Sequence, residues 1–106
     1  MDRIDKHRIY ELIDQYVGLL KMNGIPLWRV YLFGPSAGES RQTGCDIDLA
    51  IFWDLETLDG VDEDVILRKF KREIDQRIQP YSFARTDFDE THPLIRDIIE
   101  NGEWLY

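Results

Sequence analysis

The chain contains two short apolar segments, residues 29–33 and 47–53, on either side of a loop rich in glycine and hydroxyl side chains. Their composition is typical of buried β-strands near the middle of a sheet. Two carboxylates, Asp46 and Asp48, stand at the start of the second segment. Because alternate residues of a strand point to the same face, we expect both carboxylates to point the same way at the mouth of the loop.

The paired carboxylates favour a metal site. Two adjacent negative charges repel each other unless a cation lies between them. Oxygen ligands beside a loop of phosphate-binding character suit Mg²⁺ that carries a nucleoside triphosphate. Asp48 also interrupts an apolar strand, where a carboxylate costs stability unless it is paired or opens into a cleft. The alternative interpretation is an ordinary solvated pair of surface aspartates.

The rest of the chain predicts three helices and one further strand. Asn23 and Gly24 form a C-terminal capping signal for the first helix, and Asp62 is expected to cap the second. Pro80 lacks an amide donor, so its strand is expected at an edge or a bulge of the sheet. The helices are expected over residues 3–22, over 61–76 and from Pro93 to Gly102, the third strand over 77–84, and a short apolar tail over 104–106.

The predicted order of elements is α-β-β-α-β-α. A chain of 106 residues is long enough for one small domain with one core. We therefore expect a single α+β domain over residues 1–106, with a small mixed β-sheet and helices packed on one side.

The net charge and the composition limit which binding partners and which cellular compartment we expect. The net charge of −8 argues against free nucleic acid as a partner, because such binding depends on the release of counterions by positive protein surfaces. No apolar run is long enough to cross a membrane, and the first residues lack the pattern of a signal peptide. The single cysteine, Cys45, cannot form an internal disulfide, which favours a reducing, cytoplasmic setting.

The segment from residue 32 to residue 52 resembles the signature of the nucleotidyltransferase superfamily that has the DNA polymerase β-type palm. That signature is Gly-Ser, a spacer of about ten residues and Asp-x-Asp, and Gly34, Asp46 and Asp48 match its glycine and its aspartates. The short chain and its helix-strand-loop-strand opening resemble the minimal, MNT-type members. The resemblance implies a polymerase β-like fold, phosphates close to Gly34, and Mg²⁺ on Asp46 and Asp48 for in-line displacement at phosphorus.

Two positions depart from the family pattern. Pro35 occupies the place of the serine, and Ser36 beside it could supply a phosphate-binding hydroxyl from another direction. Gln79 is the residue best placed to match the third carboxylate, which in the family completes a second metal site and helps to activate the attacking hydroxyl. A glutamine can bind a metal through its carbonyl oxygen, but it brings no charge and cannot act as a base. Asp75 and Asp87 lie on either side of this strand without the spacing that the family uses.

These residues leave several functions open. The resemblance implies an enzyme that transfers AMP from ATP to an acceptor hydroxyl, and minimal members often act as antitoxins that modify a HEPN-domain toxin. An acidic surface would suit a basic, RNase-like partner. The alternative is a binding module of the same fold that assembles with a partner protein without catalysis, which Pro35 and Gln79 favour. A third possibility is one subunit of a two-chain transferase. The oligomeric state, including a homo-oligomer, stays open.

Overall fold

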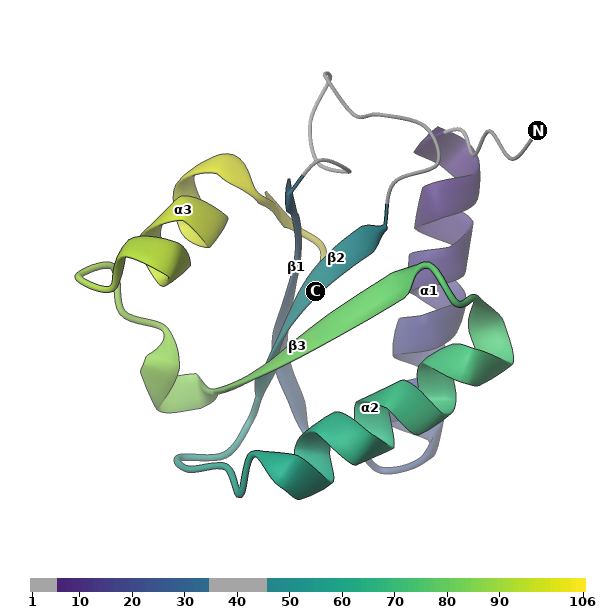
Figure 1. The fold of residues 1–106 in the computed structure, drawn as a ribbon, viewed down its shortest axis with the longest axis horizontal. Helices are drawn as coiled ribbons and strands as arrows, with labels where there is room; N and C mark the ends of the chain where they lie inside the picture. The colour runs from purple at the N-terminus through teal and green to yellow at the C-terminus, as the bar shows by residue number, and fades with distance from the viewer. Residues whose placement is uncertain (1–5, 35–45) are drawn as a thin grey trace.

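The computed structural model describes residues 6–34 and 46–106. Within them the chain forms an α+β arrangement of three α-helices and one mixed four-stranded sheet, in the strand order β3-β2-β1-β4 (Figure 1). Strand β1 is antiparallel to β2 and β4, whereas β2 and β3 are parallel. The elements are α1 (Lys6–Met22), β1 (Leu27–Phe33), β2 (Ile47–Trp53), α2 (Val61–Ile74), β3 (Ile78–Ala84), the 3₁₀ helix η2 (Arg85–Asp87), α3 (Pro93–Asn101) and β4 (Glu103–Trp104).

Helix α1 forms because its apolar residues recur every three or four positions and make one stripe. It ends where the sequence predicts. Gly24 adopts a φ of 75°. Its amide donates to the Lys21 carbonyl at 3.1 Å, and the Ile25 amide donates to the Leu20 carbonyl at 3.1 Å. This left-handed turn satisfies the last carbonyl groups of the helix. The buried stripe consists of Ile9, Leu12, Ile13, Tyr16 and Leu20.

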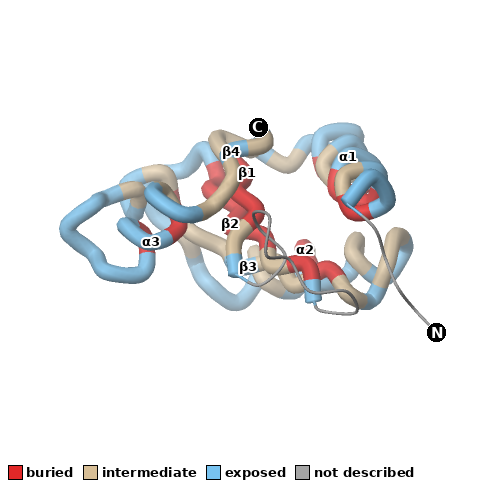
Figure 2. The backbone as a smooth tube through the Cα atoms, turned by 90° about the horizontal axis from the view of Figure 1, so that it is seen from above, coloured by how far each residue is buried: buried red, intermediate tan, exposed pale blue. Residues whose placement is uncertain are grey.

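The two faces of the sheet carry different cores. Alternate residues of β1 and β2, such as Leu32 and Leu49, pack in one core with the buried residues of α1 and α2. The intervening residues, such as Tyr31 and Phe52, pack in a second core with Ile95 and Ile98 of α3. Seen from above, α1 and α3 lie on opposite sides of the sheet (Figure 2). The expectation of helices on one side is therefore wrong. Both faces of β1 and β2 are apolar, and α3 covers the face that α1 and α2 leave open.

The positions and bounds of the helices and strands confirm some expectations and correct others. Strand β3 lies at the edge of the sheet, as Pro80 predicts. The second helix is capped by Gly60 rather than by Asp62. The Glu63 carboxylate accepts the Gly60 amide at 2.6 Å, which satisfies a donor at the helix start. The expected apolar tail instead adds strand β4, with Trp104 paired to Tyr31. Within the described residues, no helix has the length and apolar character needed to cross a bilayer.

Tyr16 joins α1 to α2 in the core. Its side chain is fully buried, and its hydroxyl donates to the Leu67 carbonyl of α2 at 2.8 Å. Burial raises the pKa of Tyr16, so the hydroxyl stays protonated and remains a donor.

We expect Tyr16→Phe to lower the free energy of unfolding by about 1 kcal/mol, because the ring still fills the core while the hydrogen bond is lost. Denaturant unfolding measures the change. The control is Tyr106→Phe at an exposed position, which should stay within about 0.5 kcal/mol of the native chain. Equal stabilities of the two variants would contradict this role of the Tyr16 hydroxyl.

Candidate functional site

Strand pairing brings the residues predicted from the sequence together where β1 ends and β2 begins. Phe33, the last residue of β1, pairs with Asp48 near the start of β2. Gly34 follows Phe33 directly, and Asp46 directly precedes β2. The end of β1 and the start of β2 therefore place Gly34, Asp46 and Asp48 together. Pro35, Ser36 and Cys45 lie outside the described residues, so their expected roles stay predictions.

Gly34 packs its backbone against the carboxylate of Asp48. Its φ is 74°, in the left-handed region that side chains rarely adopt. A Cβ atom at Gly34 would lie 2.6 Å from Asp48 Oδ2, closer than van der Waals contact permits. Glycine is therefore required here by backbone conformation and by space. The contact holds a backbone turn directly beside a candidate metal ligand.

The two aspartates interact electrostatically. Partial burial raises the pKa of Asp48, and the nearby negative charge of Asp46 raises it further. A hydrogen bond from the Tyr81 side chain opposes both effects. Asp46 is exposed and Asp48 is half-buried, so the pair opens to solvent from the edge of the sheet. A divalent cation between the two carboxylates would relieve their repulsion.

Gln79 lies beside Asp48. The two residues pair in the parallel register of β2 and β3, so their side chains leave the same face of the sheet. The Gln79 amide donates to the Gln76 carbonyl at 3.4 Å. A neutral amide therefore occupies the strand position next to Asp48, at the residue that the family resemblance had matched to the third carboxylate.

The two nearby aspartates considered as substitutes for Gln79 have other partners. Asp75 forms a two-pronged ion pair with Arg77, with both nitrogen–oxygen distances at 3.1 Å, and this hydrogen bonding lowers the pKa of Asp75. Asp87 accepts the Ala84 amide at 2.8 Å, at the opposite end of β3. Within residues 6–34 and 46–106, no three histidine, cysteine, aspartate or glutamate side chains group as ligands for one metal ion.

Tyr81 is a site residue that the sequence interpretation did not identify. It follows Gln79 by two positions on β3, so both side chains leave the same face. Burial, then the charges of Asp48 and Asp46, and last a side-chain interaction with Asp48 raise the pKa of Tyr81. Its ring contacts the Phe33 ring with centroids 5.5 Å apart. Strand alternation from Gln79 was the signal that could have found it.

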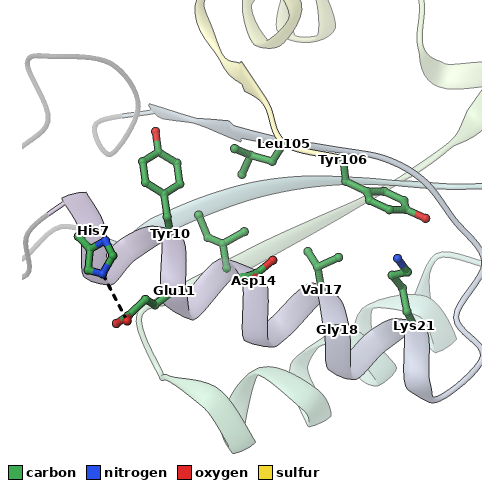
Figure 3. A pocket seen from close by; sticks show the side chains of 10 residues that line it. His7, Tyr10, Glu11, Asp14, Val17, Gly18, Lys21, Leu105 and Tyr106 are labelled. Carbon is green, nitrogen blue, oxygen red and sulfur yellow. Dashed lines mark ion pairs between the residues drawn. The ribbon is translucent and has the colours of Figure 1, made fainter.

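A separate hollow of about 500 Å³ lies between α1 and the C-terminal residues 105–106, and its lining includes none of the aspartate pair (Figure 3). At one end His7 and Glu11 form an ion pair at 3.5 Å. At the other end the Lys21 ammonium lies 4.8 Å from the centre of the Tyr106 ring. The His7 and Lys21 side chains thus each have a partner within the chain at the two ends of this hollow.

Comparisons of the chain with protein-family models, with curated proteins and with solved structures found no match. The function is therefore inferred from the residues and their geometry.

We expect Gly34→Ala to lower the free energy of unfolding by about 2–3 kcal/mol, because the new Cβ meets the Asp48 carboxylate as well as an unfavourable φ. The matched control is Gly24→Ala, which has a φ of 75° and nothing within 4 Å of the new Cβ. It should cost about 1 kcal/mol from backbone strain alone. Equal costs of the two variants in denaturant unfolding would exclude the contact with Asp48.

In the absence of divalent cations, we expect Asp48→Asn to raise the free energy of unfolding at neutral pH, by less than about 1 kcal/mol because solvent screens part of the effect. The reason is that burial and the Asp46 charge both disfavour the ionised carboxylate. Thermal unfolding in a chelating buffer measures the change, and Glu90→Gln at an exposed position is the control. A destabilised Asp48→Asn variant would contradict this electrostatic account.

Proposed function

We propose that the chain is a Mg²⁺-dependent nucleotidyltransferase with a polymerase β-like fold, which moves AMP from ATP to an acceptor hydroxyl on a partner protein. One observation supports this most strongly. The backbone of Gly34 packs against Asp48 at the same sheet edge as Asp46. A glycine turn beside two carboxylates gives phosphates a close approach to the backbone and gives a cation two oxygen ligands.

The donor set fits a hard divalent cation. Both candidate ligands are carboxylates, and the charge of Asp46 already disfavours the ionised form of Asp48. Asp46 and Asp48 would hold Mg²⁺, which supplies charge neutralisation to the triphosphate. Gly34 leaves room for the phosphates, and Ser36 is the proposed hydroxyl donor to them.

The reaction joins the acceptor oxygen to the α-phosphorus while the bond to the bridging oxygen breaks and pyrophosphate leaves. The acceptor must also lose a proton. Gln79 cannot accept it, since its amide is not a base at neutral pH. Proton transfer is therefore the step that this site supports least.

Gln79 also favours a second candidate function. With an amide beside Asp48, the same fold could bind a nucleotide or a partner protein without transferring anything. A HEPN-domain toxin is the proposed partner in either case, and the cytoplasm the proposed compartment. A chain that assembles with a separately encoded catalytic subunit is a related form of this candidate.

The test of transfer uses ATP labelled at the α-phosphate, Mg²⁺ and a purified HEPN-domain protein as acceptor. We expect label on the acceptor, and we expect the double variant Asp46→Asn with Asp48→Asn to lower the rate by about 10³-fold or more. A complex that forms equally well with native chain and double variant, without any transfer of label, would support the binding module instead.

A second test asks whether the missing carboxylate limits the reaction. We expect Gln79→Glu to raise the transfer rate by about tenfold or more, because a base contributes about 10²–10⁴-fold when it is well placed. The control is Gln76→Glu, which adds the same charge on the connection between α2 and β3. An equal change in both variants would mean that charge alone, and not position beside Asp48, affects the rate.

A further inference from the structure

An aromatic pair stands beside the aspartates on the face of the sheet that carries Asp48. Phe33 pairs with Asp48 across β1 and β2, and Tyr81 pairs with Ala50 across β2 and β3. Ala50 has only a methyl side chain, which leaves space for the two larger rings to meet above β2. The Phe33 and Tyr81 rings make that contact with an angle of 61° between their planes. The rings therefore flank the Asp48 carboxylate.

The Tyr81 ring is held in place but is not covered. Phe33 contacts one part of the ring, and the Tyr81 hydroxyl interacts with Asp48 strongly enough to affect the pKa of both groups. Nevertheless 46% of the Tyr81 surface is exposed. Helix α3 and Phe88 cover the neighbouring Tyr31 and Phe52 instead. A ring that Phe33 supports on one part, and that is otherwise open to solvent, thus lies next to the proposed phosphate site.

We propose that Tyr81, supported by Phe33, is the surface on which the base of the bound nucleotide stacks. This inference rests on the proposed function, because Asp46 and Asp48 must first hold the phosphate end. The base and the ribose can then extend along the same face of the sheet toward the ring. Stacking on an aromatic side chain tolerates any base and favours the larger ring system of a purine.

The competing role of Tyr81 is to orient the Asp48 carboxylate through its hydroxyl. The two roles use different atoms of the side chain. Tyr81→Phe keeps the ring and removes the hydroxyl, whereas Tyr81→Leu removes the ring as well. Inorganic tripolyphosphate carries the phosphate charge without a base, so it separates the phosphate site from the stacking surface.

The experiment measures the dissociation constants of ATP and of tripolyphosphate by calorimetry, in Mg²⁺, for the full native chain and both variants. We expect Tyr81→Leu to raise the dissociation constant of ATP about tenfold. The dissociation constant of tripolyphosphate should stay within about twofold of the native value. Tyr81→Phe should keep the dissociation constant of ATP within about threefold of the native value. Tyr106→Leu, which removes an exposed ring at the C-terminal end of the chain, should change neither ligand. Circular dichroism verifies that each variant folds.

Two results would contradict the stacking role of Tyr81 without contradicting the phosphate site. One is a Tyr81→Leu variant that binds ATP like the native chain, and the other is an equal loss of ATP and tripolyphosphate. In both cases the phosphate site still stands if Asp46→Asn with Asp48→Asn abolishes the binding of both ligands. The proposed function fails if neither ligand binds the native chain, or if the double variant of Asp46 and Asp48 binds both ligands as the native chain does. The stacking role of Tyr81 then fails with it.

Discussion

The pairing of β1 with β2 determines where Gly34 and the two aspartates lie. It sets Phe33 opposite Asp48, so the glycine that follows β1 meets the carboxylate near the start of β2. A shift of one residue in this register would turn Asp48 into the core shared with α1 and α2. The buried leucines of both strands oppose such a shift, because they would then leave that core. Packing on one face of the sheet thus positions the polar site on the other.

Much of this arrangement could be predicted from the sequence where local chemistry decides it. Gly24 ends α1 because a left-handed turn needs glycine, and Pro80 lies on an edge strand because it lacks a donor. The alternation of side chains along a strand is enough to predict that Asp46 and Asp48 lie together. Gln79 was matched from the family resemblance, and the parallel register of β2 and β3 places it beside Asp48.

The remaining features depend on packing between distant segments. Both faces of β1 and β2 are apolar, so the sequence did not reveal which face α3 would cover. The tail joins the sheet as β4 because β1 has a free edge, where the Leu105 amide donates to the Val30 carbonyl at 2.8 Å. Tyr81 looks like an ordinary strand aromatic until the register shows Phe33 and Asp48 beside it.

The charges that suit Asp46 and Asp48 to hold a cation also lower the stability of the fold when no cation is bound. Asp48 is partly buried near a like charge, an arrangement that weakens the fold unless a cation or a hydrogen bond compensates. An amide at Gln79 keeps a third negative charge away from Asp48, and the same amide cannot act as the base that the proposed transfer would need.

A crystal structure of the chain with Mn²⁺ and a non-hydrolysable ATP analogue tests most directly whether the two aspartates hold a metal ion and a nucleotide. We expect an anomalous peak in contact with both Asp46 and Asp48, with phosphate oxygens on the same ion next to the Gly34 backbone. A metal ion bound elsewhere, or nucleotide bound away from this edge with both aspartates unchanged, would contradict this expectation.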